Sequence, residues 1–178
     1  MNAVEHKNKI AIFDLDGTLW NMNSHIMVLN SYFNTKFYTS VFYKGLRHFF
    51  PKKMYEFICS KYRQIPKEYV LSFEPEFDET ILSVLNEKRK LGYFVLILSN
   101  APYEIVFHAS ERIGIQFLVA PIGGKKEILD KNYSYDFLFV CTDNMEDIDL
   151  LKASNERKII WNKYNSDFFV SHGFEKEI

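Results

Sequence analysis

The chain has 178 residues, of which 47% are hydrophobic and 25% charged, a composition typical of one globular domain with room for an inserted subdomain. The net charge of −1 gives no general reason to expect a nucleic-acid partner, and no apolar run approaches the ~20 residues that cross a bilayer. The two cysteines lie far apart and no signal-peptide segment opens the chain. We therefore expect a cytoplasmic protein without a disulfide framework or an integral membrane segment; the sequence indicates no oligomeric state.

Hydrophobic periodicity divides the first half of the chain into one strand and a run of helices. Residues 1–8 are polar, and we expect them to be frayed. The next expected elements are a strand at 9–13 and helices at 24–35, 40–50, 52–63 and 77–91, with an irregular segment between Pro66 and Pro75.

From residue 93 onward, apolar strands alternate with amphipathic helices. We expect strands at 93–98, 117–120, 137–141 and 158–161, and helices at 102–113, 125–131 and 146–154. Because this alternation is typical of a parallel sheet covered by helices, the predicted fold is an α/β, Rossmann-like sheet of about five strands.

The first strand runs directly into the stretch Asp14-Leu15-Asp16-Gly17-Thr18. In an extended chain residues i and i+2 project to the same side, so Asp14 and Asp16 can face one site. Two carboxylates at such a short distance repel each other unless a cation lies near them. Gly17 permits a sharp turn, and Thr18 adds a hydroxyl beside the acids. We interpret this stretch as a reaction centre rather than as an ordinary acidic turn.

Other polar residues follow later strands of the same predicted sheet. They are Ser99 and Asn100, Thr142 and Asp143, and, after a glycine pair, Lys125 and Lys126. Ligands of open parallel sheets bind outside the carboxyl ends of the strands, so these groups converge if the strands are neighbours. Hard oxygen ligands in this number favour Mg²⁺. The combination favours phosphoryl transfer, in which a carboxylate attacks phosphorus and water later hydrolyses the acyl phosphate.

Four motifs occur in the order found in a known family. The stretch from Asp14 to Thr18 resembles the first motif of the haloacid dehalogenase-like (HAD) phosphohydrolases, and Leu96–Asn100 resembles the second. Lys125–Leu129 resembles the third motif, a lysine that opens a helix. Thr142–Asp147 resembles the fourth, a pair of acids four residues apart. Together the motifs span most of the chain.

The resemblance implies a role for each of the four acids. Asp14 is expected to be the nucleophile and a Mg²⁺ ligand. Asp16 is expected to be the general acid and base, and to bind Mg²⁺ through its backbone carbonyl. Asp143 is expected to be the other protein ligand of the metal, and Asp147 to support either the metal or the lysine.

The same resemblance indicates which groups contact phosphate. The expected contacts are Thr18, Ser99 and the backbone of Asn100. We prefer Lys125 as the motif lysine, because the leucine four residues later resembles the phosphoserine-phosphatase branch of the family; Lys126 stays an alternative.

Three positions depart from the family pattern. Thr142 stands where the fourth motif usually has glycine, and Ala101 ends a Ser-Asn-Ala run where phosphoserine phosphatases have Ser-Gly-Gly. Asn23 stands where that branch carries a glutamate for the amine of its substrate. The Asn23 replacement argues against phosphoserine as the substrate, and all three leave the core chemistry unchanged.

The resemblance also divides the chain into an α/β core, residues 1–20 and 76–178, and a helical cap, residues 21–75. Residues 31–62 hold eleven aromatic residues and six Lys or Arg, against one acid, Glu56. One interpretation is a cap whose aromatic residues pack inside and whose cations form its solvated face. The other is that some of them form a basic, apolar pocket mouth for an anionic substrate with an apolar part.

Alternative site types fit the sequence less well. Counted from Asp14, the positions of the glycine and the last ligand of an EF-hand loop hold Leu19 and His25, and no P-loop occurs. A dehalogenase does not need Asp16. The expected activity is therefore Mg²⁺-dependent hydrolysis of a small phosphomonoester through an aspartyl-phosphate. The alternatives are a phosphotransferase or phosphomutase of the same superfamily, and a non-catalytic binding protein with this fold.

Overall fold

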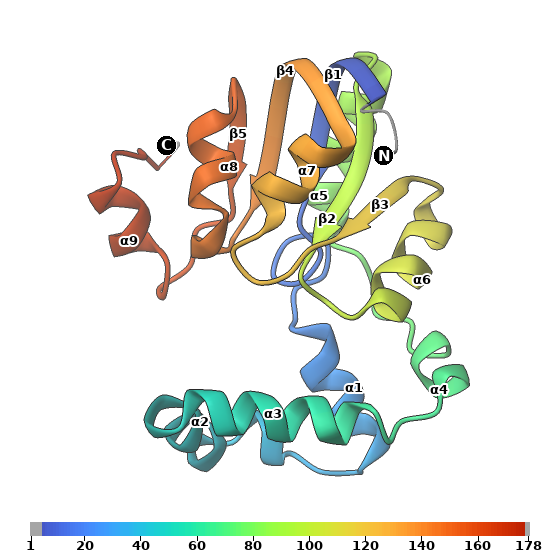
Figure 1. The fold of residues 1–178 in the computed structure, drawn as a ribbon, viewed down its shortest axis with the longest axis vertical. Coiled ribbons are helices and arrows are strands. Elements are labelled where there is room, and N and C mark those ends of the chain that lie inside the picture. The colour runs from blue at the N-terminus through green and yellow to red at the C-terminus, as the bar shows by residue number, and fades with distance from the viewer. Residues whose placement is uncertain (1–4, 177–178) are drawn as a thin grey trace. The chain divides into compact units, whose positions relative to one another are not determined.

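The computed structural model describes residues 5–176, apart from the side chains of Pro51 and Tyr55. These residues form two compact units (Figure 1). The core unit consists of the described residues within 1–21 and 76–178, and the helical unit of residues 22–75. That the helical unit caps an active site stays a prediction.

The core unit contains a parallel sheet with the strand order β3-β2-β1-β4-β5. Its strands are β1 (Glu5–Phe13), β2 (Phe94–Ser99), β3 (Gln116–Val119), β4 (Tyr133–Thr142) and β5 (Glu156–Ile159). Phe13 lies opposite Ile97 of β2 and Cys141 of β4, so the three central strands end at the same edge. The predicted α/β fold with five parallel strands is confirmed.

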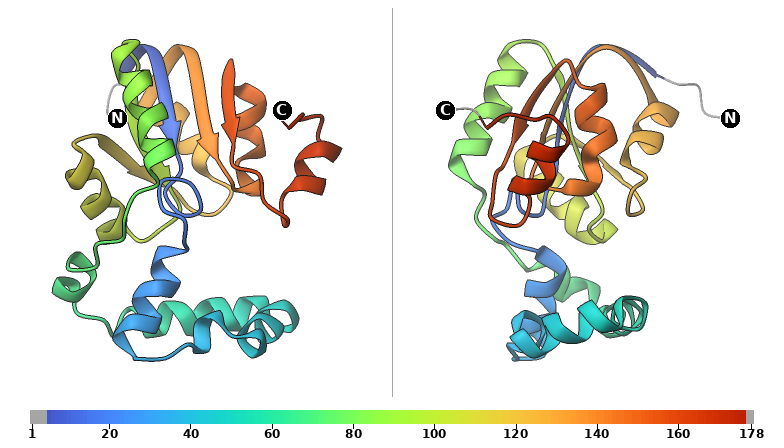
Figure 2. Two further views of the ribbon diagram at one scale, coloured as in Figure 1. Left: turned by 180° about the vertical axis from the view of Figure 1, so that it is seen from behind. Right: turned by 90° about the vertical axis from the view of Figure 1, so that its left-hand side faces the viewer.

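Helices cover both faces of this sheet (Figure 2). They are α5 (Glu79–Lys90), α6 (Tyr103–Ile113), α7 (Lys125–Asn132), α8 (Ile148–Ala153), which follows a 3₁₀ turn at Met145–Asp147, and α9 (Ser166–Ser171). Helix α5 contacts β1 and β2, whereas α7 and α8 contact β4. Figure 2 shows α5 on one side of the sheet and α7 and α8 on the other.

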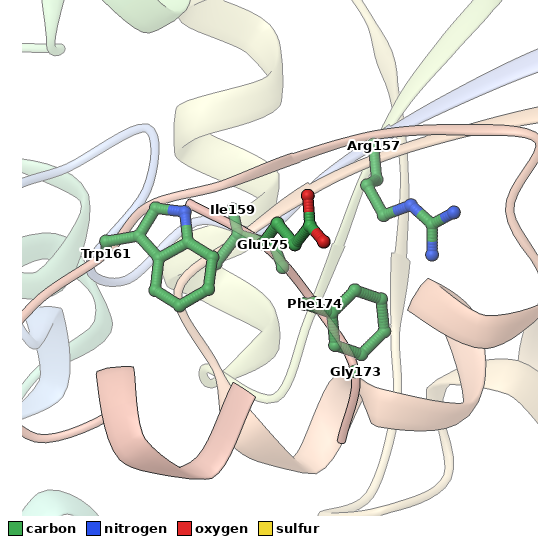
Figure 3. A pocket seen from close by; sticks show the side chains of 6 residues that line it. All are labelled: Arg157, Ile159, Trp161, Gly173, Phe174 and Glu175. Carbon is green, nitrogen blue, oxygen red and sulfur yellow. The ribbon is translucent and has the colours of Figure 1, made fainter. Parts of the chain in front are cut away.

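The outer strand β5 and the C-terminal segment border a cavity of about 290 Å³ (Figure 3). The guanidinium group of Arg157 lies 5.1 Å from the ring centroid of Phe174 and donates a hydrogen bond to the carbonyl of Leu151. The contact with Phe174 holds the C-terminal segment against the edge strand, and the hydrogen bond joins that strand to α8. None of the site residues expected from the sequence lines this cavity.

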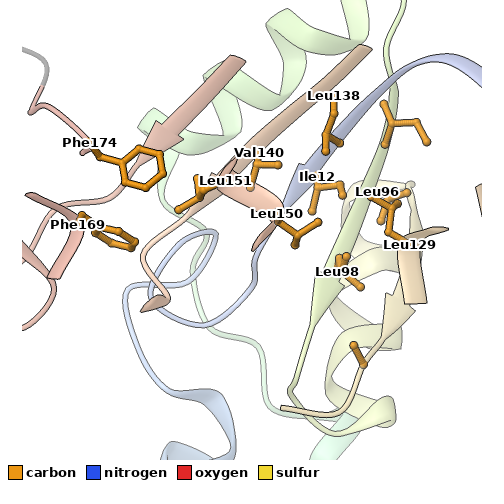
Figure 4. Packing of buried hydrophobic residues seen from close by; sticks show 12 residues of the cluster. Ile12, Leu96, Leu98, Leu129, Leu138, Val140, Leu150, Leu151, Phe169 and Phe174 are labelled. Atoms are coloured by element: carbon orange, nitrogen blue, oxygen red, sulfur yellow. The ribbon is translucent and has the colours of Figure 1, made fainter. Parts of the chain in front are cut away.

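Burial of an apolar core on one face of the sheet stabilises the core unit (Figure 4). Alternate residues of a strand share a face, and Ile12, Leu96 and Val140 of the central strands are buried together. Leu129 of α7 and Leu150 of α8 pack against them. Each such side chain contributes roughly 1.5–3 kcal/mol through burial, which fixes the strand ends that carry the polar residues.

Strands β1 and β4 are longer than the sequence predicts. β1 begins at Glu5 and β4 at Tyr133, and these two residues are paired. The expectation of a frayed segment is therefore wrong for residues 5–8, while residues 1–4 lie outside the described part. The added residues are mostly exposed and are held by main-chain pairing, with a contact of 3.0 Å between His6 Nδ1 and Ser134 Oγ. A search for apolar runs does not detect such pairing.

Two short helices were not predicted, and one strand is displaced. The segment after Pro66 contains α4 (Lys67–Leu71), and α9 follows the last strand. Helices of five or six residues are too short to show a periodicity, and tertiary packing stabilises them. β5 begins at Glu156, two residues before the predicted start.

The helical unit contains α1 (Ser24–Tyr32), a 3₁₀ turn at Phe37–Thr39, α2 (Val41–Phe49), α3 (Pro51–Tyr62) and α4. Helix α1 ends earlier than expected, before Asn34, which adopts a positive φ of 46°. Tyr38 and Tyr43 are buried, and both pack against the ring of Phe37. Part of the aromatic content thus forms the core of this unit. Within residues 5–176, no helix is both long and apolar enough to cross a membrane.

Candidate active site

The polar residues that end the central strands lie at one edge of the sheet. The backbone N–H of Asp14 donates to the carbonyl of Cys141 at 2.9 Å, which extends the pairing of β1 and β4 by one residue. Ser99 ends β2 and Thr142 ends β4 on either side of β1. Parallel pairing therefore brings three of the four motifs together, as the sequence predicts.

A buried ion cluster connects the first motif to the third and fourth motifs. The ammonium group of Lys125 lies 3.0 Å from Asp14 Oδ1 and 2.8 Å from Asp147 Oδ2, and all three side chains are buried. Burial by itself lowers the pKa of Lys125, but the charges of Asp14 and Asp147 outweigh it and raise the pKa. Lys125 is therefore a cation in this cluster.

Lys126, the alternative lysine, lies elsewhere. Its ammonium group forms an ion pair with Asp130, one helical turn along α7, and its side chain is about one-third exposed. Lys125 opens α7 directly after Gly124, where an added Cβ would lie 2.7 Å from a side-chain atom of Pro121. The first lysine of the pair, and not the second, thus reaches Asp14.

Thr142 connects the same acids through its hydroxyl. The buried hydroxyl donates to Asp147 Oδ2 at 2.7 Å and accepts from the backbone N–H of Asn144 at 3.0 Å; it also lies 3.5 Å from Asp14 Oδ2. Burial raises the pKa of Asp147, and the charge of Lys125 opposes that rise. Of the two roles that the sequence left open for Asp147, these contacts favour support of the lysine.

The turn at Gly17 approaches Asp143 very closely. Gly17 has a φ of +76°, and a Cβ added there would lie 2.3 Å from Asp143 Oδ2. The backbone N–H of Asp143 donates to the Thr18 hydroxyl at 3.1 Å, and that hydroxyl lies 3.4 Å from Asp143 Oδ1. Thr18 thus positions Asp143, and its contact with phosphate stays a prediction.

Asn165 belongs to the site, although the sequence analysis did not predict it. This buried side chain donates to the carbonyl of Asp143 at 2.7 Å and to that of Ile160 at 3.0 Å, so it holds the loop that carries Asp143. Asn165 lies outside all four motifs, in the turn before α9, and no sequence signal indicated it.

Asp16 lies in a tight loop that directly follows Asp14. The backbone N–H of Gly17 donates to the carbonyl of Trp20 at 2.7 Å, and Asp16 is bridged to Trp20. The half-buried Asp16 is thereby fixed two residues beyond Asp14. Its role as general acid and base stays a prediction.

The side chains of the second motif hold the loops around the site. The hydroxyl of Ser99 accepts from the backbone N–H of Ala101 at 3.1 Å. The amide of Asn100 donates to the carbonyls of Ala120 and Pro121, at 3.0 and 2.8 Å. The side chain of Asn100 therefore fixes the segment that leads to Lys125. The expected phosphate contact of Asn100, through its backbone, stays a prediction.

The donor set at this edge fits a divalent cation. Asp14 and Asp143 bring two carboxylates, while Asp147 is paired with the ammonium group of Lys125. Burial, and next the charge of Asp14, raise the pKa of Asp143 to about 6, more than Lys125 and the hydrogen bond from Thr18 lower it. Within residues 5–176, no group of three or more acidic, histidine or cysteine side chains is placed to hold a metal ion by itself. Mg²⁺ suits such a site, because it binds through one or two carboxylates and completes its shell with water and phosphate oxygens.

Comparisons with solved structures identify the fold. A phospho-aspartyl intermediate analogue of phosphoserine phosphatase has a TM-score of 0.64 and 18% identity, and 85% of each chain is covered. A HAD family hydrolase from Salmonella enterica also has a TM-score of 0.64, with 13% identity, 86% of this chain and 62% of the other. A Bordetella pertussis protein of unknown function has a TM-score of 0.62, 13% identity and coverage of 97% and 98%.

The chain therefore has the HAD-like fold and is similar in structure to phosphoserine phosphatase, as its motifs predict. No protein-family model and no curated protein shows a significant match.

Proposed function

We propose that this protein is a Mg²⁺-dependent phosphatase that hydrolyses a small phosphomonoester through an aspartyl-phosphate on Asp14. The observation that carries the proposal is the ion pair of 3.0 Å between Asp14 and Lys125, at the sheet edge where Asp143 also lies. A buried carboxylate beside a cation, with further acids for a metal, is the arrangement that attack on phosphorus requires.

The contacts of Asp14 indicate which oxygen attacks. Oδ1 accepts from the backbone N–H of Leu15 at 2.8 Å and pairs with Lys125, whereas Oδ2 lies 3.5 Å from the Thr142 hydroxyl. We therefore assign the attack to Oδ2. A bond forms between this oxygen and phosphorus, the bond from phosphorus to the ester oxygen breaks, and Asp16 protonates that leaving oxygen.

The second half of the reaction restores the enzyme. Asp16, now a carboxylate, removes a proton from a water molecule that attacks the phosphorus of the acyl phosphate, which releases phosphate and frees Asp14. Lys125 offsets negative charge at Asp14 in both steps. Asp14, Asp143 and the backbone carbonyl of Asp16 would hold Mg²⁺, which offsets repulsion between the phosphate and the acids.

The structure also bears on the substrate. The side chain of Asn23 accepts from the backbone N–H of Ile26 at 3.3 Å and so caps helix α1. The residue that stands in place of the amine-binding glutamate therefore has a structural task in its own helix. This supports a substrate other than phosphoserine.

The decisive experiment measures hydrolysis of para-nitrophenyl phosphate and of a broad panel of phosphate esters by the purified chain. We expect activity that requires Mg²⁺ and disappears with a chelator, and a loss of about a thousandfold or more in Asp14→Asn. The matched control is Asp149→Asn, because Asp149 is exposed on α8 and should leave activity unchanged.

Two results would point to the alternatives. Absence of Mg²⁺-dependent hydrolysis across the panel would favour a binding protein with this fold. Transfer of the phosphoryl group to an added alcohol in preference to water would favour a phosphotransferase or phosphomutase.

Thr142 is expected to position the reacting carboxylates. Thr142→Val keeps the shape of the side chain but removes the hydroxyl that donates to Asp147 and accepts from Asn144. We expect the free energy of unfolding to fall by about 1.5–3 kcal/mol, since the lost hydrogen bond involves a charged group, and kcat to fall roughly tenfold. Thr142→Ser retains the hydroxyl and should restore most of both quantities. If the serine variant lost as much as the valine variant, the hydroxyl would not be the relevant group.

A further inference from the structure

Helix α2 carries an apolar strip on its outward face. Val41, Phe42 and Phe49 are 86%, 68% and 74% exposed, whereas the neighbouring Tyr43 is 2% exposed. Phe42 and Phe49 are seven positions apart, which is two helical turns, so their side chains lie on a common face, and Val41 borders that face. Phe50, directly after the helix, is 52% exposed. The core of the helical unit thus uses one side of α2 and leaves a second apolar side uncovered.

Exposed cations lie close to this strip in the sequence. Lys44 and Arg47 lie on α2 itself, and Lys52 and Lys53 lie in the first turn of α3, which begins at Pro51 directly after Phe50. We define the α2–α3 surface as Val41, Phe42, Lys44, Arg47, Phe49, Phe50, Lys52 and Lys53.

The charge of the chain is divided unequally between its units. Residues 22–75 hold eight Lys and Arg against three Glu, whereas the rest of the chain holds fourteen Lys and Arg against twenty Asp and Glu. An overall charge of −1 therefore conceals a strongly basic helical unit. The exposed aromatic residues of α2 lie in the basic part of the protein.

We propose that the α2–α3 surface binds the surface of an anionic lipid bilayer. A helix that combines large apolar side chains with Lys and Arg lies in the bilayer interface, where the apolar groups enter the acyl boundary and the cations meet anionic headgroups. Charge complementarity favours this occupant. Lysine is depleted in protein–protein interfaces but attracted to anionic membranes, and three of the four cations here are lysines.

Two other occupants fit the surface less well. A small phosphomonoester cannot cover apolar side chains that extend along a nine-residue helix, which is roughly 13 Å long. A second copy of the chain would need an apolar patch with a polar rim, whereas here lysines lie between the aromatic residues in the chain. Lipid binding is also independent of turnover, so the proposal does not rest on the phosphatase activity.

The test is co-sedimentation of the full chain with vesicles of phosphatidylcholine alone and of phosphatidylcholine with 30% phosphatidylglycerol. We expect binding to the anionic vesicles at least about tenfold stronger than to the neutral ones, and a decrease as NaCl is raised from 50 to 500 mM. Asp14→Asn should bind equally well, which separates this proposal from the proposed catalysis.

Two surface variants and one control define the contact. Phe42→Ser/Phe49→Ser and Lys44→Gln/Lys52→Gln/Lys53→Gln should each weaken binding about tenfold or more, with circular dichroism reporting that the helices remain. The control Lys163→Gln/Tyr164→Ser removes a lysine and an exposed aromatic residue of the core unit, where the Lys163 ammonium group lies 5.0 Å from the ring centroid of Tyr164. This control should bind as the wild type does.

Three outcomes would overturn the proposal. The first is equal binding to neutral and anionic vesicles, and the second is equal binding by the surface variants and the wild type. The third is self-association in sedimentation velocity that Phe42→Ser/Phe49→Ser abolishes while vesicles bind none of the proteins. That result would assign the α2–α3 surface to a contact between two copies.

Discussion

Lys125→Met should lose about 3–5 kcal/mol of the free energy of unfolding and most of the activity. The substitution keeps an unbranched side chain of similar length but leaves the buried carboxylates of Asp14 and Asp147 without their cation. Removal of one partner from a buried ion pair is costly because the remaining charge is neither solvated nor compensated. Urea denaturation measures the first loss. The initial rate of phosphate release measures the second, which we expect to be about a hundredfold or more.

The adjacent lysine provides the control for this experiment. Lys126→Met removes a half-buried cation that pairs with Asp130 across one helical turn, an arrangement worth less than about 1 kcal/mol. It should leave the activity unchanged. The double variant Lys125→Met/Asp147→Asn should regain part of the stability, since it also removes one of the two uncompensated charges. Similar losses in both single variants would mean that Lys125 has no special role.

Gly17→Ala is expected to reduce activity by about a hundredfold or more while the protein remains folded. An alanine Cβ at this position would lie 2.3 Å from Asp143 Oδ2, so the Asp143 carboxylate has to move away from the site. A misplacement of about 1 Å in a reacting constellation can cost this much in rate. The apparent affinity for Mg²⁺, measured from the metal dependence of the rate, should fall as well, because Asp143 is a proposed ligand.

Gly92→Ala separates this steric effect from backbone strain. Gly92 has a φ of +79°, close to the +76° of Gly17, but nothing lies within 4 Å of an added Cβ there. Both variants should lose about 1 kcal/mol of stability from an alanine in the left-handed region. Only Gly17→Ala should lose activity and metal affinity. Full activity in Gly17→Ala would show that the position of Asp143 does not matter for the reaction.

The sequence predicted the parts of the fold that depend on local pattern. The apolar runs before Asp14, Ser99 and Thr142 identified three strands, and their alternation with helices indicated parallel pairing. Hydrophobic periodicity is a local property, so these elements could be found without knowledge of their neighbours. The exposed halves of β1 and β4 could not, because only their pairing with each other makes residues 5–8 part of a strand.

The sequence of the helical unit shows many aromatic and basic residues, but it did not predict which of the aromatic side chains are buried and which are exposed. Tyr38 and Tyr43 pack inside the helical unit, whereas Phe42 and Phe49 are exposed. Which aromatic side chain is buried depends on the face that α2 turns toward its neighbours. A high aromatic count alone therefore could not distinguish a packed interior from a binding surface.

The motif spacing by itself determined that the two acids of Asp14-Leu15-Asp16 stand directly after a strand, and that the other polar groups follow strands of the same sheet. Tertiary structure alone decided which side chains meet. It brought Lys125 rather than Lys126 to Asp14, gave the Thr142 hydroxyl to Asp147, directed Thr18 to Asp143, and added Asn165 to the site. The physical reason is that these contacts join residues far apart in the chain, and each forms only after burial of the core has fixed where every strand and helix ends.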